Sequence, residues 1–300
     1  MIVTDKKRPD IASPVRTRAI METYGLSFKK SLGQNFLTDV NVLKKIVNAA
    51  QVDENDDVIE IGPGIGALTE QIAKKAHSVL ALELDDRLIP VLSETLAPYD
   101  NIQVLRQDVL KADLKDLLAR HFDGQHQVKV VANLPYYITS PIILHLLETG
   151  IHFEAIVVMM QREVAERLGA RPGTKAYGSL TVRVQYQMNV QVAFIVPKTV
   201  FVPQPKVDSA IVVLDPKEVQ VLPQNEQLFF KVVRGCFQHR RKNIWNNLLA
   251  FLGKQTVDKE KLQRVLAELN ISPKERAENL AINDFIHLTN KIIDFNIIEK

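Results

Sequence analysis

Between residues 58 and 160 the chain alternates short runs of β-branched and apolar residues with segments of helical spacing. The strand-like runs span 58–61, 79–84, 102–106, 128–132 and 155–160, and the helical segments lie around 68–75, 88–96, 114–120 and 141–147. This alternation predicts an α/β fold with a doubly wound, Rossmann-like parallel sheet. Two further runs, 190–196 and 209–214, are joined without a helical pattern, so we expect them to close the sheet as a hairpin.

The strand pattern ends after Pro216 and Pro223, and residues 226–300 have helical patterns only. We therefore place the main domain boundary near 218–225. Three parts are expected: a basic, flexible or loosely packed N-terminal arm over 1–26, the α/β domain over 27–220 and a small all-helical domain over 221–300. The run 180–186 alternates like a strand, although its spacing also admits a helix.

Composition narrows the class of protein. The chain has 300 residues, of which 46% are hydrophobic and 24% are charged, as is typical of a globular protein with more than one core. Its single cysteine, Cys236, excludes a disulfide framework and a cysteine-based metal site, and it indicates a reducing, cytoplasmic location. The chain has neither an apolar run of about eighteen residues nor an apolar N-terminal segment. We therefore expect no secretion and no membrane partner.

Positive charge gathers at the two ends of the chain. Residues 1–35 carry seven Lys or Arg against three acidic residues, and residues 221–300 carry thirteen against nine, whereas the whole chain is only +3. The middle is therefore acidic. Basic ends of this kind suggest contact with a polyanion, although an ordinary solvated surface explains the charge counts alone at least as well.

A glycine-rich loop at residues 60–67, Glu-Ile-Gly-Pro-Gly-Ile-Gly-Ala, follows the first strand-like run. It matches the dinucleotide pattern G-x-G-x-x-G/A at Gly62, Gly64 and Ala67. However, Pro63 removes an N–H donor that a phosphate loop would use, and Glu60 puts a carboxylate near the phosphates. Neither feature opposes S-adenosylmethionine, which has no phosphate and carries two cationic groups. The loop by itself does not decide between these cofactors.

Two carboxylates follow the next two strand-like runs. Glu83 ends the second run about twenty residues after the loop and suits ribose hydroxyls in either cofactor. Asp108 follows the third run and could accept a hydrogen bond from an adenine amine. Capping or turn roles are the alternative for both residues, but their combination with the glycine loop favours cofactor binding.

The fourth strand-like run ends at Asn133-Leu134-Pro135-Tyr136, where open α/β sheets bind ligands. The Asn133 side-chain oxygen and the Leu134 carbonyl can accept from a flat exocyclic amine, and Tyr136 offers a ring for stacking. Pro135 biases Leu134 away from helical geometry, which frees the Leu134 carbonyl. A plain strand-ending turn explains these four residues alone equally well.

Together these motifs resemble the ribosomal RNA adenine N6-dimethyltransferase family. The similarity covers nearly the whole chain and includes three further segments: Gly33 to Leu37, Phe201 to Ser209 and Phe237 to Lys242. The tail and the length are most similar to the bacterial branch that dimethylates two adjacent adenosines near the 3′ end of 16S rRNA, rather than to the macrolide-resistance branch. The chain departs from the usual family pattern at residues 243–245, Asn-Ile-Trp.

The resemblance implies a methyltransferase fold that uses S-adenosyl-L-methionine, and a helix over 180–186. It implies a cofactor pocket lined by Asn35, Leu37, Gly62, Gly64, Glu83, Asp108 and Asn133. Asn133 and Leu134 would hold the target amine next to Pro135, and Tyr136 and Phe201 would flank the extruded base. Without the resemblance, Phe201 is better interpreted as core filling. No metal and no strong general base are expected, and the implied partner of this monomeric enzyme is 16S rRNA in a small-subunit precursor.

The C-terminal segment has two stripes when it is placed on one helix. The apolar stripe contains Phe230, Val233, Phe237, Ile244 and Leu248, and the second contains Lys231, Arg234, Gln238, Arg241, Lys242 and Trp245. A row of cations with one aromatic suits a phosphate backbone, so Arg234, Arg241 and Lys242 are predicted to bind RNA. A solvated basic face with Trp245 packed into the domain is nearly as consistent with the spacing.

Two other classes of function compete with methyl transfer. An NAD-dependent oxidoreductase would use the same fold, but Pro63, Glu60 and the lack of a candidate proton donor count against hydride chemistry. A non-catalytic RNA-binding assembly factor is left open by the sequence as an additional role. DNA adenine methylation is a nearer rival, although the usual tetrad there has proline at the position of Leu134.

Overall fold

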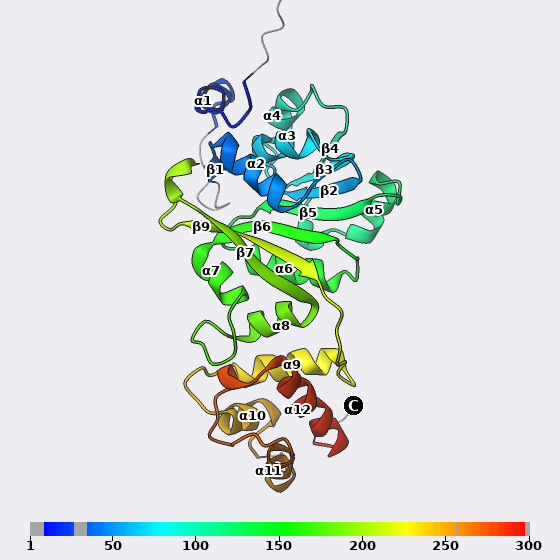
Figure 1. Cartoon of the computed structure of the whole chain (residues 1–300), viewed down its shortest axis with the longest axis vertical. Coiled ribbons are helices and arrows are strands. Elements are labelled where there is room, and N and C mark those ends of the chain that lie inside the picture. The colour runs from blue at the N-terminus through cyan, green and yellow to red at the C-terminus, as the bar shows by residue number, and fades with distance from the viewer. Residues whose placement is uncertain (1–8, 27–34, 256, 298–300) are drawn as a thin grey trace, which may run out of the picture. The chain divides into compact units, whose positions relative to one another are not determined.

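The structure is a computed structural model that describes residues 9–26, 35–255 and 257–297 (Figure 1). The chain divides into two compact units. Unit 1 comprises Met1–Ala165 and Asn189–Pro216, and unit 2 comprises Glu166–Met188 and Lys217–Lys300. The break after Pro216 lies just before the boundary expected near 218–225. The assignment of Glu166–Met188 to unit 2 differs from the prediction, because residues such as Tyr177 and Tyr186 are buried among the C-terminal helices.

Unit 1 is built on a seven-stranded sheet with the strand order β4-β3-β2-β5-β6-β9-β7. Its strands are β2 (Asp56–Ile61), β3 (Ser78–Glu83), β4 (Ile102–Arg106), β5 (Gln127–Asn133), β6 (Ala155–Gln161), β7 (Met188–Val196) and β9 (Ser209–Pro216). The first five strands pair in parallel, and β9 pairs antiparallel with β6. This confirms the predicted parallel sheet and the two late strands that close it.

Helices cover the sheet because their apolar faces pack against its apolar side chains. Figure 1 shows α2 and α3 on one side of the sheet and α6 on the other. The helices of this unit after residue 35 are α2 (Val40–Ala49), α3 (Ala67–Ala73), α4 (Ile89–Thr95), α5 (Leu114–His121), α6 (Thr139–Glu148) and the start of α7 (Arg162–Leu168), together with the 3-10 turns η2 (Val109–Lys111) and η3 (Lys198–Val200). Asp39 caps α2 by accepting from the N–H groups of Asn41 and Val42.

A second, two-stranded sheet lies outside the main one. β1 (Phe36–Leu37) pairs antiparallel with β8 (Phe201–Val202), so that Leu37 lies opposite Phe201. Thr38 extends the contact, because both its N–H and its hydroxyl donate to the Val200 carbonyl. This pairing brings the segment before α2 next to the loop before β9, although the two are more than 160 residues apart in the chain.

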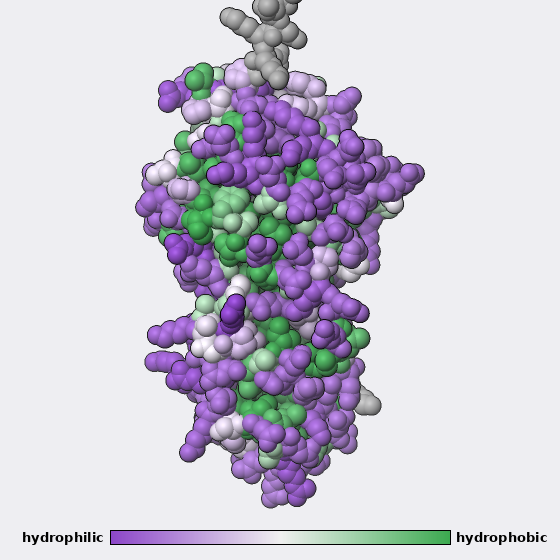
Figure 2. Space-filling view, viewed as in Figure 1, coloured by the Kyte–Doolittle hydropathy of each residue, from purple (hydrophilic) through white to green (hydrophobic). Residues whose placement is uncertain are grey.

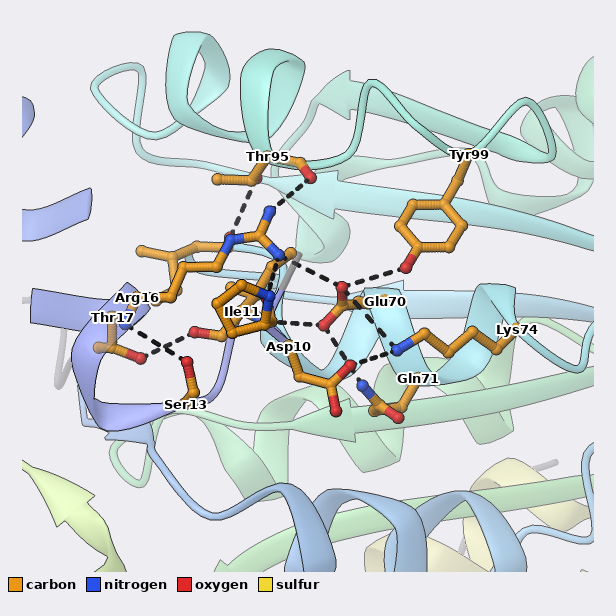
Figure 3. Close-up of polar contacts among 12 residues, drawn as sticks. Asp10, Ile11, Ser13, Arg16, Thr17, Glu70, Gln71, Lys74, Thr95 and Tyr99 are labelled. Atoms are coloured by element: carbon orange, nitrogen blue, oxygen red, sulfur yellow. Dashed lines mark hydrogen bonds and ion pairs between the residues drawn. The ribbon is translucent and has the colours of Figure 1, made fainter. Parts of the chain in front are cut away.

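Residues 9–26 form a packed element and not the loose arm that the sequence suggested. α1 (Pro14–Thr23) follows Ile11 and Ala12, both of which are fully buried. The carboxylate of Glu70 on α3 accepts from the Ile11 N–H at 2.8 Å and the Tyr99 hydroxyl at 3.0 Å, and it faces the Arg16 guanidinium at 3.6 Å (Figure 3). Burial, together with the Glu70 charge, raises the pKa of Tyr99 to about 12. Residues 1–8 of the predicted arm lie outside the described residues.

Unit 2 is helical, as the pattern of its last eighty residues predicted. Its helices are α8 (Ser179–Gln187), α9 (Glu226–Cys236), α10 (Ile244–Leu252), α11 (Lys259–Glu268) and α12 (Ile282–Asp294), with the 3-10 turn η4 (Ala277–Asn279). They enclose a core that includes Phe229, Leu248, Leu262 and Phe285. α8 is a helix, so the alternation that suggested a strand over 180–186 was misleading and the resemblance was right.

The segment that carries the two predicted stripes is not one helix. α9 ends at Cys236 and α10 begins at Ile244, and the turn between them is held by Asn247. The Asn247 side chain accepts from the His239 N–H at 3.0 Å and donates to the His239 carbonyl at 3.2 Å. Asn243, at the site of departure from the family pattern, caps α10 by accepting from the Asn246 N–H. The basic stripe therefore runs along two helices and the turn between them.

The surface of unit 1 is largely hydrophilic, with hydrophobic side chains gathered over β6, β7 and β9 in the view of Figure 2. The edge strand β7 contributes Val192 and Ile195, which are 39% and 42% exposed. Within the described parts of the chain, no helix combines the length and the apolar character needed to cross a membrane.

Candidate active site

A cavity opens at the carboxyl ends of β2, β3 and β5, the edge at which the sequence analysis placed ligand binding. Its lining includes ten of the predicted residues: Asn35, Leu37, Gly62, Gly64, Glu83, Asp108, Asn133, Leu134, Pro135 and Tyr136. The parallel register explains this convergence, because each of these strands ends in a motif at the same edge of the sheet. Gly33 and Gln34 of the preceding motif lie outside the described residues.

The glycine loop bends sharply between β2 and α3. Gly62, Gly64 and Gly66 have φ values of 72°, 62° and 89°, which L-residues with side chains rarely adopt. A Cβ atom on Gly64 would also stand 3.0 Å from the ring of Phe36. The loop therefore needs glycine both for its backbone conformation and for its close approach to the β1 segment.

Glu83 anchors this loop from the end of β3. Its Oε1 accepts from the N–H groups of Leu84 and Asp85 at 2.9 and 2.8 Å, and its Oε2 accepts from the Gly64 N–H at 3.2 Å. Burial nevertheless raises the pKa of Glu83, because it outweighs these hydrogen bonds. The carboxylate thus has a local turn role, which was the alternative interpretation, and it also lines the cavity with acceptor capacity left on Oε2.

Glu60 is the most perturbed acid of the cavity. It is 1% exposed, and its Oε2 has no hydrogen-bond partner among the described residues. Burial raises the pKa of Glu60 to about 8, with a further contribution from the nearby charge of Glu83. A buried carboxyl group without a full set of partners is unfavourable unless a ligand compensates it. This position therefore favours a cationic group in the cavity.

Asp108 has both of the roles considered from the sequence. Its Oδ1 caps η2 by accepting from the Leu110 N–H at 3.1 Å, and its Oδ2 lies 3.8 Å from the Lys111 ammonium. The residue also lines the cavity beside Gln107. Gln107 donates its backbone N–H to the Glu83 carbonyl at 2.9 Å, which ties the ends of β3 and β4 together.

The end of β5 presents two hydrogen-bond acceptors. Asn133 donates one of its two amide hydrogens to the Asn35 carbonyl at 3.3 Å, an orientation in which Oδ1 is the acceptor of that side chain. The Pro135 carbonyl is occupied by the Ile138 N–H at 3.2 Å and the Thr139 hydroxyl at 3.0 Å. The Leu134 carbonyl, by contrast, accepts no hydrogen bond within the described ranges of the chain. These two free oxygens suit a planar amine.

Two tyrosines stand beside these acceptors. The hydroxyl of Tyr136 is 2.8 Å from the hydroxyl of Ser209 on β9, and burial raises the pKa of Tyr136. This bond fixes the Tyr136 ring while it lines the cavity. Tyr137 also lines the cavity and is 56% exposed. Sequence reasoning did not select Tyr137, although an aromatic directly after the tetrad was a usable signal.

Leu84 is a second lining residue that sequence reasoning missed. It follows Glu83 directly and is 49% exposed, an unusual exposure for a leucine at the end of a buried strand. A large apolar side chain at the rim of a cavity can cover the flat face of a ring. The signal for it was the leucine next to the acid that ends the second strand-like run.

Phe201 is not placed in the cavity. Its side chain is 3% exposed and belongs to the hydrophobic core of unit 1, with Leu37 as its neighbour in the β1–β8 pair. This geometry matches the interpretation of Phe201 as core filling. Its predicted place against an extruded base stays a prediction.

The three predicted RNA-binding cations lie in unit 2. Arg234 is on α9, and Arg241 and Lys242 are in the turn before α10; all three are exposed. None of them has an ion-pair partner among the residues that the structure describes. Trp245, in contrast, is partly buried against the core of unit 2, which matches the alternative considered for it.

Comparison with known proteins agrees with this geometry. The family model described as ribosomal RNA adenine dimethylase matches residues 25–293. The chain is 63% identical to a protein of Ligilactobacillus salivarius named ribosomal RNA small subunit methyltransferase A, covering 96% of this chain and 98% of that protein. It is 54% identical to the protein of the same name from Enterococcus faecalis, covering 97% and 98%.

Solved structures show the same similarity. A dimethyladenosine transferase from Plasmodium falciparum is 30% identical, with a TM-score of 0.74, and the match covers 87% of this chain and 98% of that one. The 23S rRNA methyltransferase ErmE is 26% identical with a TM-score of 0.64, covering 86% and 99%. The family model and these relatives extend over almost the entire chain, and the chain belongs to the ribosomal RNA adenine dimethylase family.

Proposed function

We propose that this protein transfers methyl groups from S-adenosylmethionine to the N6 atoms of two adjacent adenosines near the 3′ end of 16S rRNA, during assembly of the small ribosomal subunit. The observation that carries the proposal is the pair of free acceptors on Asn133 and Leu134 in the same cavity as Glu60 and Glu83. One wall of the cavity suits a cationic cofactor, and the strand end beside it suits an exocyclic amine.

The residues of the cavity fit this cofactor. S-adenosylmethionine supplies an electrophilic methyl group on a sulfonium when it is bound. Glu60, with its unpartnered buried oxygen, would face the cationic part, and Glu83 would accept from ribose hydroxyls through Oε2. Asp108 would accept from the adenine amine, and Leu84 would cover one face of that ring. Asn35 and Leu37 complete the wall formed by the β1 segment.

The chain's contribution to the reaction is positioning and electrostatics. An adenine amine is a weak nucleophile because its lone pair is delocalised into the ring. Acceptors at the Asn133 Oδ1 and the Leu134 carbonyl would bind its two hydrogens and favour a pyramidal nitrogen with the lone pair directed at the methyl group. The Tyr136 ring, fixed by Ser209, would stack on the extruded base. This arrangement requires no strong general base.

The RNA substrate is proposed from two independent observations. Relatives that match almost their entire length carry small-subunit rRNA methyltransferase in their names. Three exposed cations of unit 2, which have no ion-pair partner among the described residues, suit the phosphate backbone of an RNA. We propose that Arg234, Arg241 and Lys242 contact RNA and that the working form is a monomer in the cytoplasm.

Calorimetric titration separates this proposal from its rivals. S-adenosylmethionine should bind the purified chain, whereas NAD should give no heat, and mass mapping of rRNA from a deletion strain should reveal adenosines that have lost both N6 methyl groups. Binding of NAD in place of S-adenosylmethionine would contradict the proposal. If the purified chain binds S-adenosylmethionine but rRNA methylation is unchanged in the deletion strain, the protein would act as a binding factor and not as the methyltransferase.

A further inference from the structure

A cluster of Asp57, His77 and His126 lies at the amino-terminal ends of the parallel strands, at the edge of the sheet opposite to the cavity. Asp57 is 1% exposed in β2, His77 directly precedes β3, and His126 directly precedes β5. A carboxylate oxygen of Asp57 and one nitrogen of each ring all lie within 4.8 Å of one another. The proposed activity gives no role to this cluster.

The backbone holds the three residues in place. The His77 N–H donates to the Asp56 carbonyl at 2.9 Å, and the Gln127 N–H donates to the Asn55 carbonyl at 3.0 Å. His77 itself and Gln127, the residue after His126, are therefore tied to the residues that lead into Asp57. The rings of His77 and His126 are stacked, with centroids 3.6 Å apart and planes 12° from parallel. The register of three adjacent strands sets the backbone positions of the cluster. Because each nitrogen lone pair lies in the plane of its own ring, one of the two rings has to rotate out of the stack for both to bind one ion.

The charge of Asp57 is only partly compensated. Its Oδ1 lies 3.0 Å from the His77 Nδ1, but its Oδ2 is buried and has no hydrogen-bond partner among the described residues. The neighbouring buried ammonium of Lys129 bonds to Asp56 at 2.9 Å and to the Gln51 carbonyl at 2.8 Å, so it is committed elsewhere. A buried carboxylate with an empty acceptor position is costly unless a cation or a donor reaches it.

We propose that Asp57, His77 and His126 form a binding site for one divalent transition-metal ion of the zinc type. The 3.0 Å between the His77 Nδ1 and the Asp57 Oδ1 is close to the spacing of about 3.3 Å that two ligands have on one tetrahedral zinc ion. Imidazole and carboxylate ligands suit zinc, cobalt and nickel better than the oxygen-seeking magnesium and calcium. Water molecules would complete the coordination.

A second carboxylate supports His126 from outside the cluster. The His126 Nδ1 lies 3.0 Å from the Asp123 Oδ1, the arrangement that orients histidine ligands in many metal sites. The bound ion would neutralise Asp57 and link the starts of β2, β3 and β5. Since this edge is remote from the carboxyl ends of the strands, the ion would stabilise the sheet and would take no part in methyl transfer.

Zinc titration of the untagged, metal-free full chain tests the proposal. Competition against a chelator should show one Zn²⁺ per chain, and Zn²⁺ should raise the thermal unfolding temperature. His77→Ala and His126→Ala each remove a ligand from a partly exposed position and should weaken binding at least about tenfold, and Asp123→Asn should weaken it about 10–100-fold. The matched control is His287→Ala, which removes an exposed imidazole from α12 in unit 2.

Three results would overturn the site. Wild-type protein that binds no Zn²⁺ would show that the His77–Asp57 contact is only a hydrogen bond. Equal binding by wild type, His77→Ala and His126→Ala would place the ion elsewhere on the surface. A weakening by His287→Ala as large as that by His126→Ala would mean non-specific histidine binding. Cys236 cannot confuse the measurement, because it is the only cysteine and is fully buried.

Discussion

Asn133 donates a hydrogen bond from its side-chain amide to the main-chain carbonyl of Asn35, 3.3 Å away, and thereby joins segments 98 residues apart. The bond fixes the orientation of the amide, and the side-chain oxygen is the group that can accept from a substrate amine. It also connects the wall of the cofactor cavity to the end of β5. In the proposed reaction, this one side chain would couple the position of the cofactor to the position of the target amine.

Glu83→Gln should weaken the binding of S-adenosylmethionine. The substitution keeps the shape of the side chain but removes the carboxylate charge that we propose for the ribose hydroxyls, and charged-group hydrogen bonds contribute about 1.5–3 kcal/mol. Calorimetry should therefore show a dissociation constant raised by about one to two orders of magnitude. Glu54→Gln, on an exposed turn, is the matched control. An unchanged dissociation constant for Glu83→Gln would contradict ribose binding.

Glu60 should make the stability of the free protein depend on pH. Its pKa is about 8 in the folded chain and near the ordinary value of 4.5 when unfolded. Between these values the folded state holds a proton that the unfolded chain releases, so the free energy of unfolding should fall as the pH rises through this window. Denaturation across the window should give a shallower slope for Glu60→Gln. Identical slopes would place the perturbed proton elsewhere.

The same carboxyl group should couple cofactor affinity to pH. A cationic ligand favours ionised Glu60, so affinity for S-adenosylmethionine should rise as the pH approaches about 8 from below. The ligand's own titration is common to both proteins, so the difference between wild type and Glu60→Gln isolates the effect of this residue. Affinity that rises equally in both would show that Glu60 does not face the cationic groups.

Arg234→Ala, Arg241→Ala and Lys242→Ala should each weaken binding to small-subunit particles and leave cofactor binding intact. Each cation that contacts a phosphate should lower the salt-dependence slope by about one when it is removed. Lys291→Ala is the matched control, because that ammonium belongs to the same unit but is already paired with Glu268. If the triple variant keeps the wild-type affinity and slope, these residues are only surface.

Glu70→Ala should lower the free energy of unfolding without touching the cavity. The substitution leaves the buried Ile11 N–H without its acceptor and removes the partner of Tyr99, and an unsatisfied buried polar group costs about 1–3 kcal/mol. Chemical denaturation measures this loss, and Glu54→Ala again serves as the control. A change no larger than the control's would mean that the Glu70 contacts add nothing to the packing of residues 9–26.

Sequence patterns predicted the sheet and the cavity because both depend on local rules. Gly62, Gly64 and Gly66 are required by positive φ angles, and Pro135 blocks helical geometry next to Leu134. Once the strands are parallel, their carboxyl ends must meet at one edge. The positions of Glu83 and Asn133 around one cavity then follow from the strand order.

The missed features depend on contacts between distant residues. The break between α9 and α10 contains neither glycine nor proline, and it is held by the side chain of Asn247. The packing of Ile11 is decided by Glu70, 59 residues away. His77 and His126 meet Asp57 only through the register of three strands, so no spacing pattern in the sequence predicts this cluster. Phe201 was assigned by resemblance, and its burial depends on the β1–β8 pair.

The rate of dimethyladenosine formation in unmethylated small-subunit particles tests the central claim most directly. Mass spectrometry of the rRNA under single-turnover conditions should show that wild type modifies two adjacent adenosines. Asn133→Ala should do so at least about a hundredfold more slowly, since it removes an oriented acceptor that acts as the amine becomes pyramidal. Asn41→Ala, on the exposed face of α2, should match wild type. A near-wild-type rate for Asn133→Ala, with cofactor bound, would contradict the proposed role of the β5 acceptors.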